Sequence, residues 1–202
     1  MIEKDTFKTI KKPSEEVLFK DRNSKFFGYA FPVNTEEEVK EILNTLKNKH
    51  HKARHWCYAY QIGSETITYR VNDDGEPSNT AGMPIYGQIQ SFELTNILVV
   101  VIRYFGGVKL GVSGLINAYR TCAQMALEVS LVIEKTIDLP YLISFGYVTM
   151  NTVMRTIKEQ NLKIIDQKLD LSCEIIVSVR KSEVEKVLEI FEKLYKVEIK
   201  KL

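Results

Sequence analysis

The chain has 202 residues, 45% of them hydrophobic and 10% aromatic, which is enough to bury a core and excludes a disordered chain. Its 28 basic and 26 acidic residues leave a formal charge of +2, which excludes a protein drawn to nucleic acid by its net charge. A nucleic-acid partner would therefore have to meet a local cluster of cations.

The first quarter of the chain predicts strands followed by a helix. The strand-like runs FKTIKK (residues 7–12) and EVLFKDRNSKFFGYAFPV (residues 16–33) come first, with the turn-prone residues DRNSK inside the second. Thr35 and Glu38 then stand at the spacing of a capping box, which predicts the start of a helix. The buried face of that helix is predicted from the spacing of Val39, Ile42, Leu43 and Leu46.

The middle of the chain alternates strand and helix patterns. HWCYAYQIG (residues 55–63) and TITYRV (residues 66–71) alternate polar and apolar residues and predict a hairpin. After the acidic turn NDDGEPSNTAG we expect a short helix around residues 80–90, the strand NILVVVIRYF and a long helix from about Ser113 to Leu131. These elements predict an α+β domain around a buried central strand.

The stretch EKTIDLP at residues 134–140 predicts a boundary between two domains, which we place at residues 1–136 and 137–202. The second domain predicts the order βαββαβ, a split-βαβ sandwich in which two helices cover one face of a four-stranded antiparallel sheet. Ser182 and Glu185 form a capping box ahead of its second helix. The buried faces of the two helices are predicted to be Met150, Val153, Met154 and Ile157, and Val184, Val187, Leu188 and Phe191.

The cysteines and the lack of targeting segments bear on the compartment. Cys57, Cys122 and Cys173 lie far apart in apolar surroundings, which is typical of reduced core thiols in a cytosolic protein. The first residues lack the apolar segment of a secretion signal, and the longest aliphatic run, residues 97–102, is too short to cross a bilayer. We therefore expect a soluble, cytoplasmic protein without a membrane partner.

The segment RYFGGVKLGVSGL (residues 103–115) carries four of the ten glycines. Two of them stand at the spacing of a phosphate-binding P-loop, but the lysine that should follow is missing, and no dinucleotide fingerprint is present. Arg103, Lys109 and Arg120 could still flank an anion at the start of the following helix. In the alternative interpretation, the glycines let the strand pass close to a neighbouring element.

The acidic turn is a second candidate for chemistry. Its carboxylates, Asp73, Asp74 and Glu76, could bind Mg²⁺ through oxygen or act as an acid and base pair. The turn lacks the alternating ligands of a calcium loop. A structural alternative assigns Asn79 or Thr80 as the N-cap of the next helix and leaves the remaining residues as a solvated turn.

All three histidines lie within residues 50–55. His51 and His55 have the spacing of a zincin motif without its glutamate, so a zinc site is not expected. The region also offers a basic patch followed by aromatic rings that could stack on bases. Alternatively, the cations mark a helix end and the aromatic rings a core face. The residues concerned are Lys47, Lys49, Lys52, Arg54, Trp56, Tyr58 and Tyr60.

Three blocks, HWCYAYQIG, RVNDDGEPSNTAGMPIYGQI and NILVVVIRYFGGVKLGVSGLINAYR, resemble the signature blocks of the YigZ/Impact family. The resemblance implies an Impact domain similar to domain IV of elongation factor G and to a ribosomal-protein domain, followed by a ferredoxin-like domain similar to domain V of the same factor. It also implies a role in translational control. The chain departs from the family pattern at Trp56, Asn79, Val112 and Ser113, of which Ser113 can still cap the long helix.

Three hypotheses follow for function. The first is a non-enzymatic cytoplasmic protein that binds RNA, the ribosome or translation factors, without a cofactor and without DNA specificity. Its proposed anion-binding residues are Arg70, Thr80, Arg103, Lys109, Arg120 and His55, and its structural glycines are Gly75, Gly82, Gly106, Gly107, Gly111 and Gly114. The second is a metal-assisted hydrolase or nucleotide-handling enzyme that uses His55, Asp73, Asp74 and Glu76. The third is a protein-interaction module.

Overall fold

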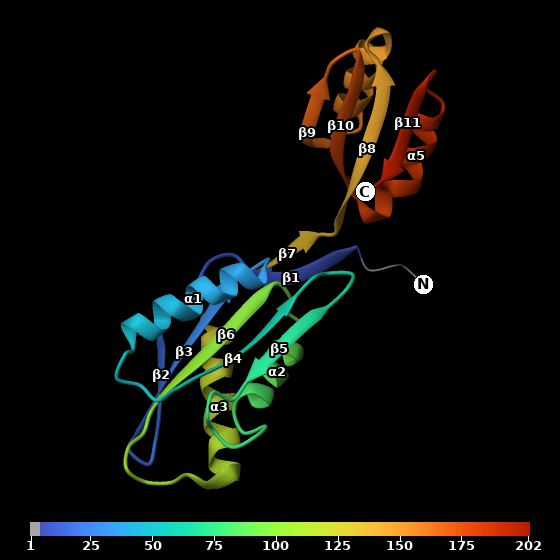
Figure 1. Ribbon diagram of the computed structural model, residues 1–202. Coiled ribbons are helices and arrows are strands. Elements are labelled where there is room, and N and C mark those ends of the chain that lie inside the picture. Colours follow the sequence, from blue (N-terminus) through green and yellow to red (C-terminus); the bar gives the residue numbers. More distant parts are fainter. Residues whose placement is uncertain (1–4) are drawn as a thin grey trace. The chain divides into compact units, whose positions relative to one another are not determined.

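A computed structural model of the chain describes residues 5–202, which divide into two compact units (Figure 1). The first unit comprises residues 7–135, and the second comprises residues 136–202 together with Asp5 and Thr6. Each unit combines helices with an antiparallel sheet, which confirms the predicted two-domain α+β class. No helix within residues 5–202 is both long and apolar enough to cross a membrane.

Asp5 belongs to the second unit although the predicted boundary placed it in the first domain. Its carboxylate accepts a hydrogen bond of 2.7 Å from Arg180 Nε, and its carbonyl accepts one of 2.7 Å from the Ile137 N–H. Hydrogen bonding from Ser182, together with the Arg180 guanidinium, holds the pKa of the Asp5 carboxyl below its usual value. Such pairing between distant segments leaves no local signal in a sequence.

The first unit is built on a five-stranded antiparallel sheet. The strands lie in the order β2 (Val17–Asp21), β3 (Ser24–Pro32), β6 (Ile97–Tyr104), β4 (His55–Ile62) and β5 (Thr68–Asn72). Its helices are α1 (Glu36–Lys49), α2 (Gly82–Ser91) and α3 (Gly111–Glu128). A separate two-stranded sheet pairs β1 (Thr6–Ile10) with β7 (Val132–Thr136). The predicted hairpin is confirmed as β4 and β5.

Strand β6 is the centre of this sheet and is covered on both faces, with α1 on one side and α2 and α3 on the other (Figure 1). Val99 and Val101 pack with the side chains of α2 and α3, whereas Val100 and Ile102 pack beneath α1. Successive side chains of a strand point to opposite faces, so burial on both faces requires an unbroken apolar run. The aliphatic segment predicted to be a buried central strand has this role.

The helix starts match the sequence unevenly. At α1, the predicted cap is confirmed, because Thr35 Oγ1 accepts a hydrogen bond of 3.2 Å from the Glu38 N–H. The Glu38 carboxylate bonds the Asn34 N–H in return, at 2.7 Å. The long helix predicted from about Ser113 begins earlier, at Gly111, and ends at Glu128. Ser113 therefore lies inside the first turn and is not its cap.

The second unit has the predicted order of strands and helices. Its elements are β8 (Asp138–Gly146), α4 (Met150–Glu159), β9 (Lys163–Leu169), β10 (Ser172–Arg180), α5 (Val184–Glu192) and β11 (Val197–Lys201), with the short 3₁₀ turns η1 (Tyr147–Thr149) and η2 (Lys181–Glu183). The strands are antiparallel in the order β11-β8-β10-β9. This order is that of a ferredoxin-like sandwich.

The helices of the second unit bury the predicted faces, but one cap is wrong. Val153 and Ile157 of α4, and Val187 and Phe191 of α5, lie in one core cluster with the strand residues. Ser182 does not cap α5, since it lies within η2, the N-cap position is Glu183, and no side chain of the described residues bonds that helix start.

Candidate functional site

The end of β6 carries a buried ion pair. Arg103 continues the face of β6 that packs against α3, and its Nη1 donates a hydrogen bond of 2.7 Å to Glu76 Oε1. The Tyr119 hydroxyl of α3 donates a second, also 2.7 Å, to the same oxygen. The side chains of Arg103 and Glu76 are 6% and 4% exposed. The acidic turn is thereby joined to both the central strand and the long helix.

The other two carboxylates of the acidic turn bond backbone amides. Asp73 accepts hydrogen bonds from the N–H groups of Ala81 and Gly82 at 2.9 and 2.8 Å, so Asp73 caps α2. The predicted cap at Asn79 or Thr80 is therefore wrong, because the side chain that bonds the first amides of α2 belongs to Asp73, earlier in the chain. The Asp74 carboxylate accepts from the Trp56 N–H at 2.7 Å. Within residues 5–202, no group of three His, Cys, Asp or Glu side chains could hold a metal ion.

The glycines of the segment after β6 serve two different purposes. A Cβ at Gly106 would lie 2.1 Å from the carbonyl carbon of Asn23, so only glycine allows the loop to pass the β2–β3 turn. Gly107 and Gly111 have φ values of +85° and +76°, and a Cβ on either would meet open space. Close packing therefore explains the first position, and backbone conformation explains the other two. The loop between them stays open to solvent.

A pocket of about 330 Å³ lies at the start of α3. It is lined by Arg103, Phe105, Lys109, Val112 and Leu115, among others. The structure thus brings together Arg103 and Lys109, two of the cations predicted to bind an anion. Lys109 is exposed, whereas Arg103 is 5% exposed and forms an ion pair with Glu76. Only the Lys109 charge is therefore accessible to solvent.

The remaining predicted anion-binding residues lie elsewhere. Arg120 lines a separate groove of about 440 Å³ between α2 and α3. Thr80 is buried, and its hydroxyl donates to the Pro77 carbonyl at 2.6 Å. The Nδ1–H of His55 donates to the Asp74 carbonyl at 2.8 Å. These residues do not form one site with Lys109.

Arg70 lies on the opposite face of the sheet from Arg103. It is directly opposite Tyr60 in the β4–β5 register, and residues opposite each other share a face. Tyr60 packs in the cluster beneath α1, whereas Phe26, opposite Arg103, packs in the cluster beneath α3. Arg70 and Arg103 therefore cannot bind one phosphate together, which corrects their grouping in one site.

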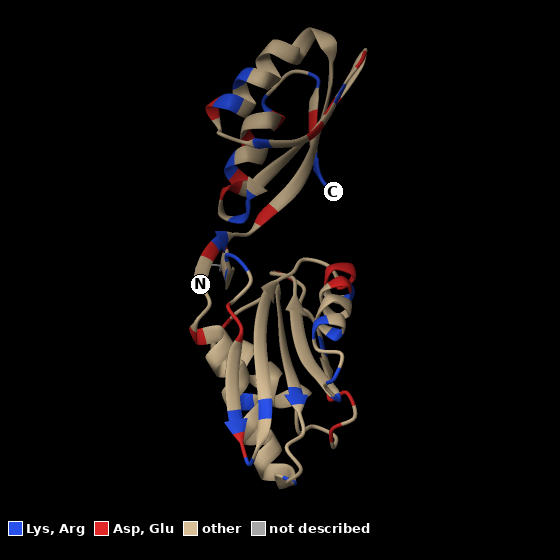
Figure 2. Cartoon of the chain, turned by 90° about the vertical axis from the view of Figure 1, so that its left-hand side faces the viewer, with Lys and Arg blue, Asp and Glu red and all other residues tan. Residues whose placement is uncertain are grey.

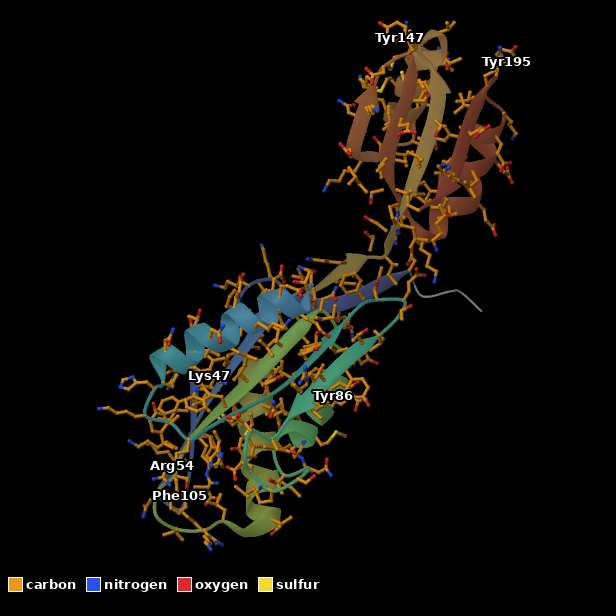
Figure 3. The ribbon with its side chains drawn as sticks, viewed as in Figure 1. Lys47, Arg54, Tyr86, Phe105, Tyr147 and Tyr195 are labelled. Carbon is orange, nitrogen blue, oxygen red and sulfur yellow. The ribbon has the colours of Figure 1, made fainter. Side chains whose placement is uncertain are left out.

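The aromatic residues of β4 form a core face and not a stacking surface. Tyr60 is 2% exposed, its hydroxyl donates to Glu36 at 2.7 Å, and burial raises its pKa to about 12. Trp56 and Tyr58 are partly buried in the same cluster beneath α1. Lys47 of α1, labelled in Figure 3, lies over the Trp56 ring at 5.8 Å. The three cysteines are also buried and free, as predicted.

Basic residues gather at the lower end of the first unit in Figure 2, and three of them were not singled out by the sequence. Lys25 is opposite Tyr104 and shares its face of the sheet, the one beneath α1, whereas the pocket lies on the face of Arg103. Lys20 and Lys25 stand directly opposite each other on β2 and β3. Arg22 lies in the turn between them. With Arg54 and Lys109 these residues form what we call the basic rim, and all five are exposed.

Backbone contacts hold the segments of the basic rim at one end of the sheet. Lys25 is paired with Tyr104 at the end of β6, and the Arg54 N–H donates to the Arg103 carbonyl at 3.4 Å. Arg54 and Phe105 lie close to each other in the view of Figure 3. No side chain of the basic rim forms an ion pair with a carboxylate within residues 5–202. The cations of the rim therefore have no direct carboxylate partner, although Asp21 lies between Lys20 and Arg22 in the chain.

A partly buried hydrogen-bond network around His50, at the end of α1, was also missed. His50 Nε2 lies 2.6 Å from the Tyr29 hydroxyl, and His50 Nδ1 lies 3.1 Å from the Tyr104 hydroxyl. The Tyr29 hydroxyl donates to the Glu16 carboxylate, which also accepts from Lys49 Nζ at 2.9 Å. Burial lowers the pKa of His50. These five residues come from distant parts of the chain, so no local pattern joins them.

Comparisons with known proteins show the family. Residues 22–127 match the Impact N-terminal domain. The chain is 39% identical over 127 residues to IMPACT family member YvyE of Bacillus subtilis, a match that covers 63% of this chain and 58% of that protein. It is 29% identical over 180 residues to an IMPACT family member of Haemophilus influenzae, covering 86% of each.

A solved structure described as the crystal structure of a hypothetical protein is similar over 97% of both chains, with a TM-score of 0.77 and 24% identity. At that level of identity the similarity shows the fold alone. The match to YvyE spans less than two thirds of that protein's length. The Impact N-terminal domain, in contrast, accounts for more than half of the 202 residues. The chain therefore belongs to the YigZ/Impact family.

Proposed function

We propose that this protein binds RNA of the translation machinery through the basic rim and acts in translational control without a catalytic step. The proposal rests on the register of Lys20 and Lys25. Like charges directly opposite each other in an antiparallel pair destabilise the sheet, and no carboxylate of residues 5–202 forms an ion pair with either. A phosphate between them would relieve that repulsion.

The surroundings of the pair support an extended anionic partner. Arg22, Arg54 and Lys109 add charge from three other segments, so the basic rim could neutralise several phosphates along one strand. Asp73 and Asp74 lie near this end of the sheet but accept hydrogen bonds from backbone amides. Their charge is thereby partly compensated, which lowers the repulsion of an incoming phosphate.

The translational part of the proposal is supported by the family. The sequence blocks that resemble the family also imply domains similar to those of elongation factor G and of a ribosomal protein. The ferredoxin-like order of the second unit agrees with the domain that this resemblance implies. Contacts between cations and phosphates position a protein on RNA, and unpaired RNA also offers its bases for contact.

The experiment measures the affinity of the full chain for a labelled single-stranded oligouridine by fluorescence polarisation at several salt concentrations. Replacing Lys20 and Lys25 together with alanine should weaken binding and lower the salt slope by about 0.7, the value for the one phosphate that the pair would neutralise. Lys40→Ala is the matched control, because Lys40 is an exposed lysine of α1 outside the basic rim. An unchanged affinity and slope in the double variant would contradict the proposal.

A further inference from the structure

We propose that the pocket at the start of α3 binds one nucleotide, either as a free nucleoside phosphate or as one unpaired residue of an RNA strand. This inference rests on the proposed RNA binding and deepens it, because it names the chemical group that the pocket takes. Two parts of the pocket carry it, a cationic part formed by Lys109 and the start of α3, and an apolar part formed around Phe105.

The cationic part suits a phosphate group. Helix α3 is 18 residues long, its N-cap is Leu110, and no side chain within residues 5–202 caps its first amides. The start of a long helix carries partial positive charge and free N–H groups, which favour an anion. Lys109 stands next to Leu110, is exposed, and adds a full positive charge to the lining of the pocket. Gly111 has a φ of +76°, and since it has no side chain, nothing of its own covers the backbone at the start of the helix.

Arg103 forms part of the wall of the pocket. Its side chain is 6% exposed, and its Nη1 and Nη2 donate to Glu76 and Ser24, but its buried Nε has no hydrogen-bond partner within residues 5–202. Buried donors in folded proteins are nearly always bonded, and one left without a partner destabilises the fold. Glu76 also lines the pocket, and its charge is paired with that of Arg103, so Lys109 supplies the net positive charge of the lining.

The apolar part suits a planar base. Phe105 is 44% exposed and Val112 is 60% exposed, and both line the pocket. The guanidinium carbon of Arg103 lies 5.4 Å from the Phe105 ring centre, which fixes one side of that ring. Exposed aromatic rings beside a phosphate site are the stacking surfaces on which proteins hold unpaired bases. The volume of about 330 Å³ is at the lower end of small-molecule sites, about 300–1,000 Å³.

A ligand that uses only one part of the pocket leaves the other part without a contact. An inorganic anion would leave Phe105 and Val112 exposed, and an apolar ligand would leave Lys109 and the α3 amides without a partner. A phosphate joined to a base uses both. The departure from the family pattern at Val112 lies in this pocket, where its apolar side chain adds to the wall beside Phe105.

The experiment titrates AMP, UMP, adenosine and inorganic phosphate into the full chain and follows binding by calorimetry and by the amide signals of residues 111–113. Phe105→Ala should weaken AMP binding about tenfold and leave phosphate binding unchanged, because it removes only the stacking surface. Lys109→Ala should weaken both. Tyr147→Ala, an exposed aromatic residue of the second unit, and Lys40→Ala are the matched controls. Thermal unfolding confirms that each variant is folded.

The possible outcomes test the nucleotide pocket separately from the basic rim, and they distinguish a free nucleotide from a residue of RNA. The inference is overturned if AMP does not bind, if adenosine binds as tightly as AMP, or if Phe105→Ala binds AMP like the unaltered protein. If AMP displaces oligouridine and Phe105→Ala weakens both, the ligand is a residue of RNA. If AMP binds without affecting RNA binding, the ligand is a free nucleotide. Loss of RNA binding in the Lys20 and Lys25 variant tests the basic rim independently.

Discussion

Arg103 and Glu76 form an ion pair of 2.7 Å whose two side chains are almost completely buried. Arg103 is the last residue but one of the central strand, and Glu76 lies in the acidic turn, 27 positions earlier. Removing ions from water is costly, and a buried pair is stable only when its remaining groups are bonded as well. The Tyr119 hydroxyl of α3 bonds the same carboxylate oxygen of Glu76, so these three residues connect strand, turn and helix.

Glu76→Ala should destabilise the first unit by about 3–5 kcal/mol, since it leaves the Arg103 guanidinium buried without a counter-charge. Glu76→Gln, which keeps an acceptor oxygen, should cost less. Urea unfolding followed by tryptophan fluorescence measures this unit specifically, because Trp56 is the single tryptophan. Glu37→Ala, which removes an exposed carboxylate 3.8 Å from Lys40, is the control and should change stability by about 1 kcal/mol at most. Equal effects of Glu76→Ala and Glu37→Ala would contradict this account.

Gly106→Ala should prevent correct folding or destabilise the first unit by more than the 1–3 kcal/mol, roughly, of ordinary overpacking. Its Cβ would meet the backbone of Asn23 at 2.1 Å, and backbone cannot rotate away as a side chain can. Gly87→Ala is the matched control, because a Cβ there meets nothing within 4 Å. In the helical setting of α2 it should raise stability by about 0.5–1 kcal/mol. Thermal unfolding of both variants decides the point.

Asp73→Ala should lower stability by about 1–2 kcal/mol or more, since it removes the acceptor for the amides of Ala81 and Gly82 at the start of α2. Asp73→Asn keeps one acceptor oxygen, so its stability should lie between those of Asp73→Ala and the unaltered protein. The measurement is urea unfolding with Mg²⁺ and with a chelator. If Mg²⁺ stabilised the unaltered protein but not Asp73→Ala, the carboxylate would be a metal ligand, and the enzyme hypothesis would gain support.

His50 should make the first unit less stable as the pH falls from about 6.5. Burial lowers its pKa in the folded state, so the unfolded chain binds the extra proton first, and stability is lost between the unfolded and the folded pKa. The groups around its ring are Glu16, Lys49, Tyr29 and Tyr104. His50→Gln should flatten the pH dependence of urea unfolding between about pH 5 and 7.

His51→Gln is the control for that measurement, because His51 is exposed and follows His50 directly in the chain. It should leave the pH dependence as it is in the unaltered protein. If both variants flattened the curve equally, or neither did, the buried position of His50 would not be the cause.

The sequence predicted well those elements whose signal is local. The aliphatic run of β6, the Thr35 cap of α1 and the alternation of β4 and β5 depend on neighbours within a few residues. The order of strands and helices in the second unit was predicted for the same reason, since each helix has its own buried face.

Contacts between distant segments could not be predicted in this way. The cap of α2 comes from Asp73 and not from the adjacent Thr80, and the partner of Arg103 is a carboxylate in another loop. The charges of Lys20 and Lys25 come together only through strand register, which a pattern along one strand does not contain. The candidate site therefore emerged from the fold, although Lys109 and the glycine segment pointed to its place.

The hydrogen bonds of Asp5 to Arg180 and Ile137 also affect how the second unit folds during synthesis and which fragments of the chain keep it intact. The second unit takes residues from both ends of the described chain, so it is completed only after the ribosome has released β11. A fragment that starts at Ile137 lacks the Asp5 carboxylate that binds Arg180. Removing Asp5 would therefore alter the ferredoxin-like unit, whose other described residues are Thr6 and residues 136–202.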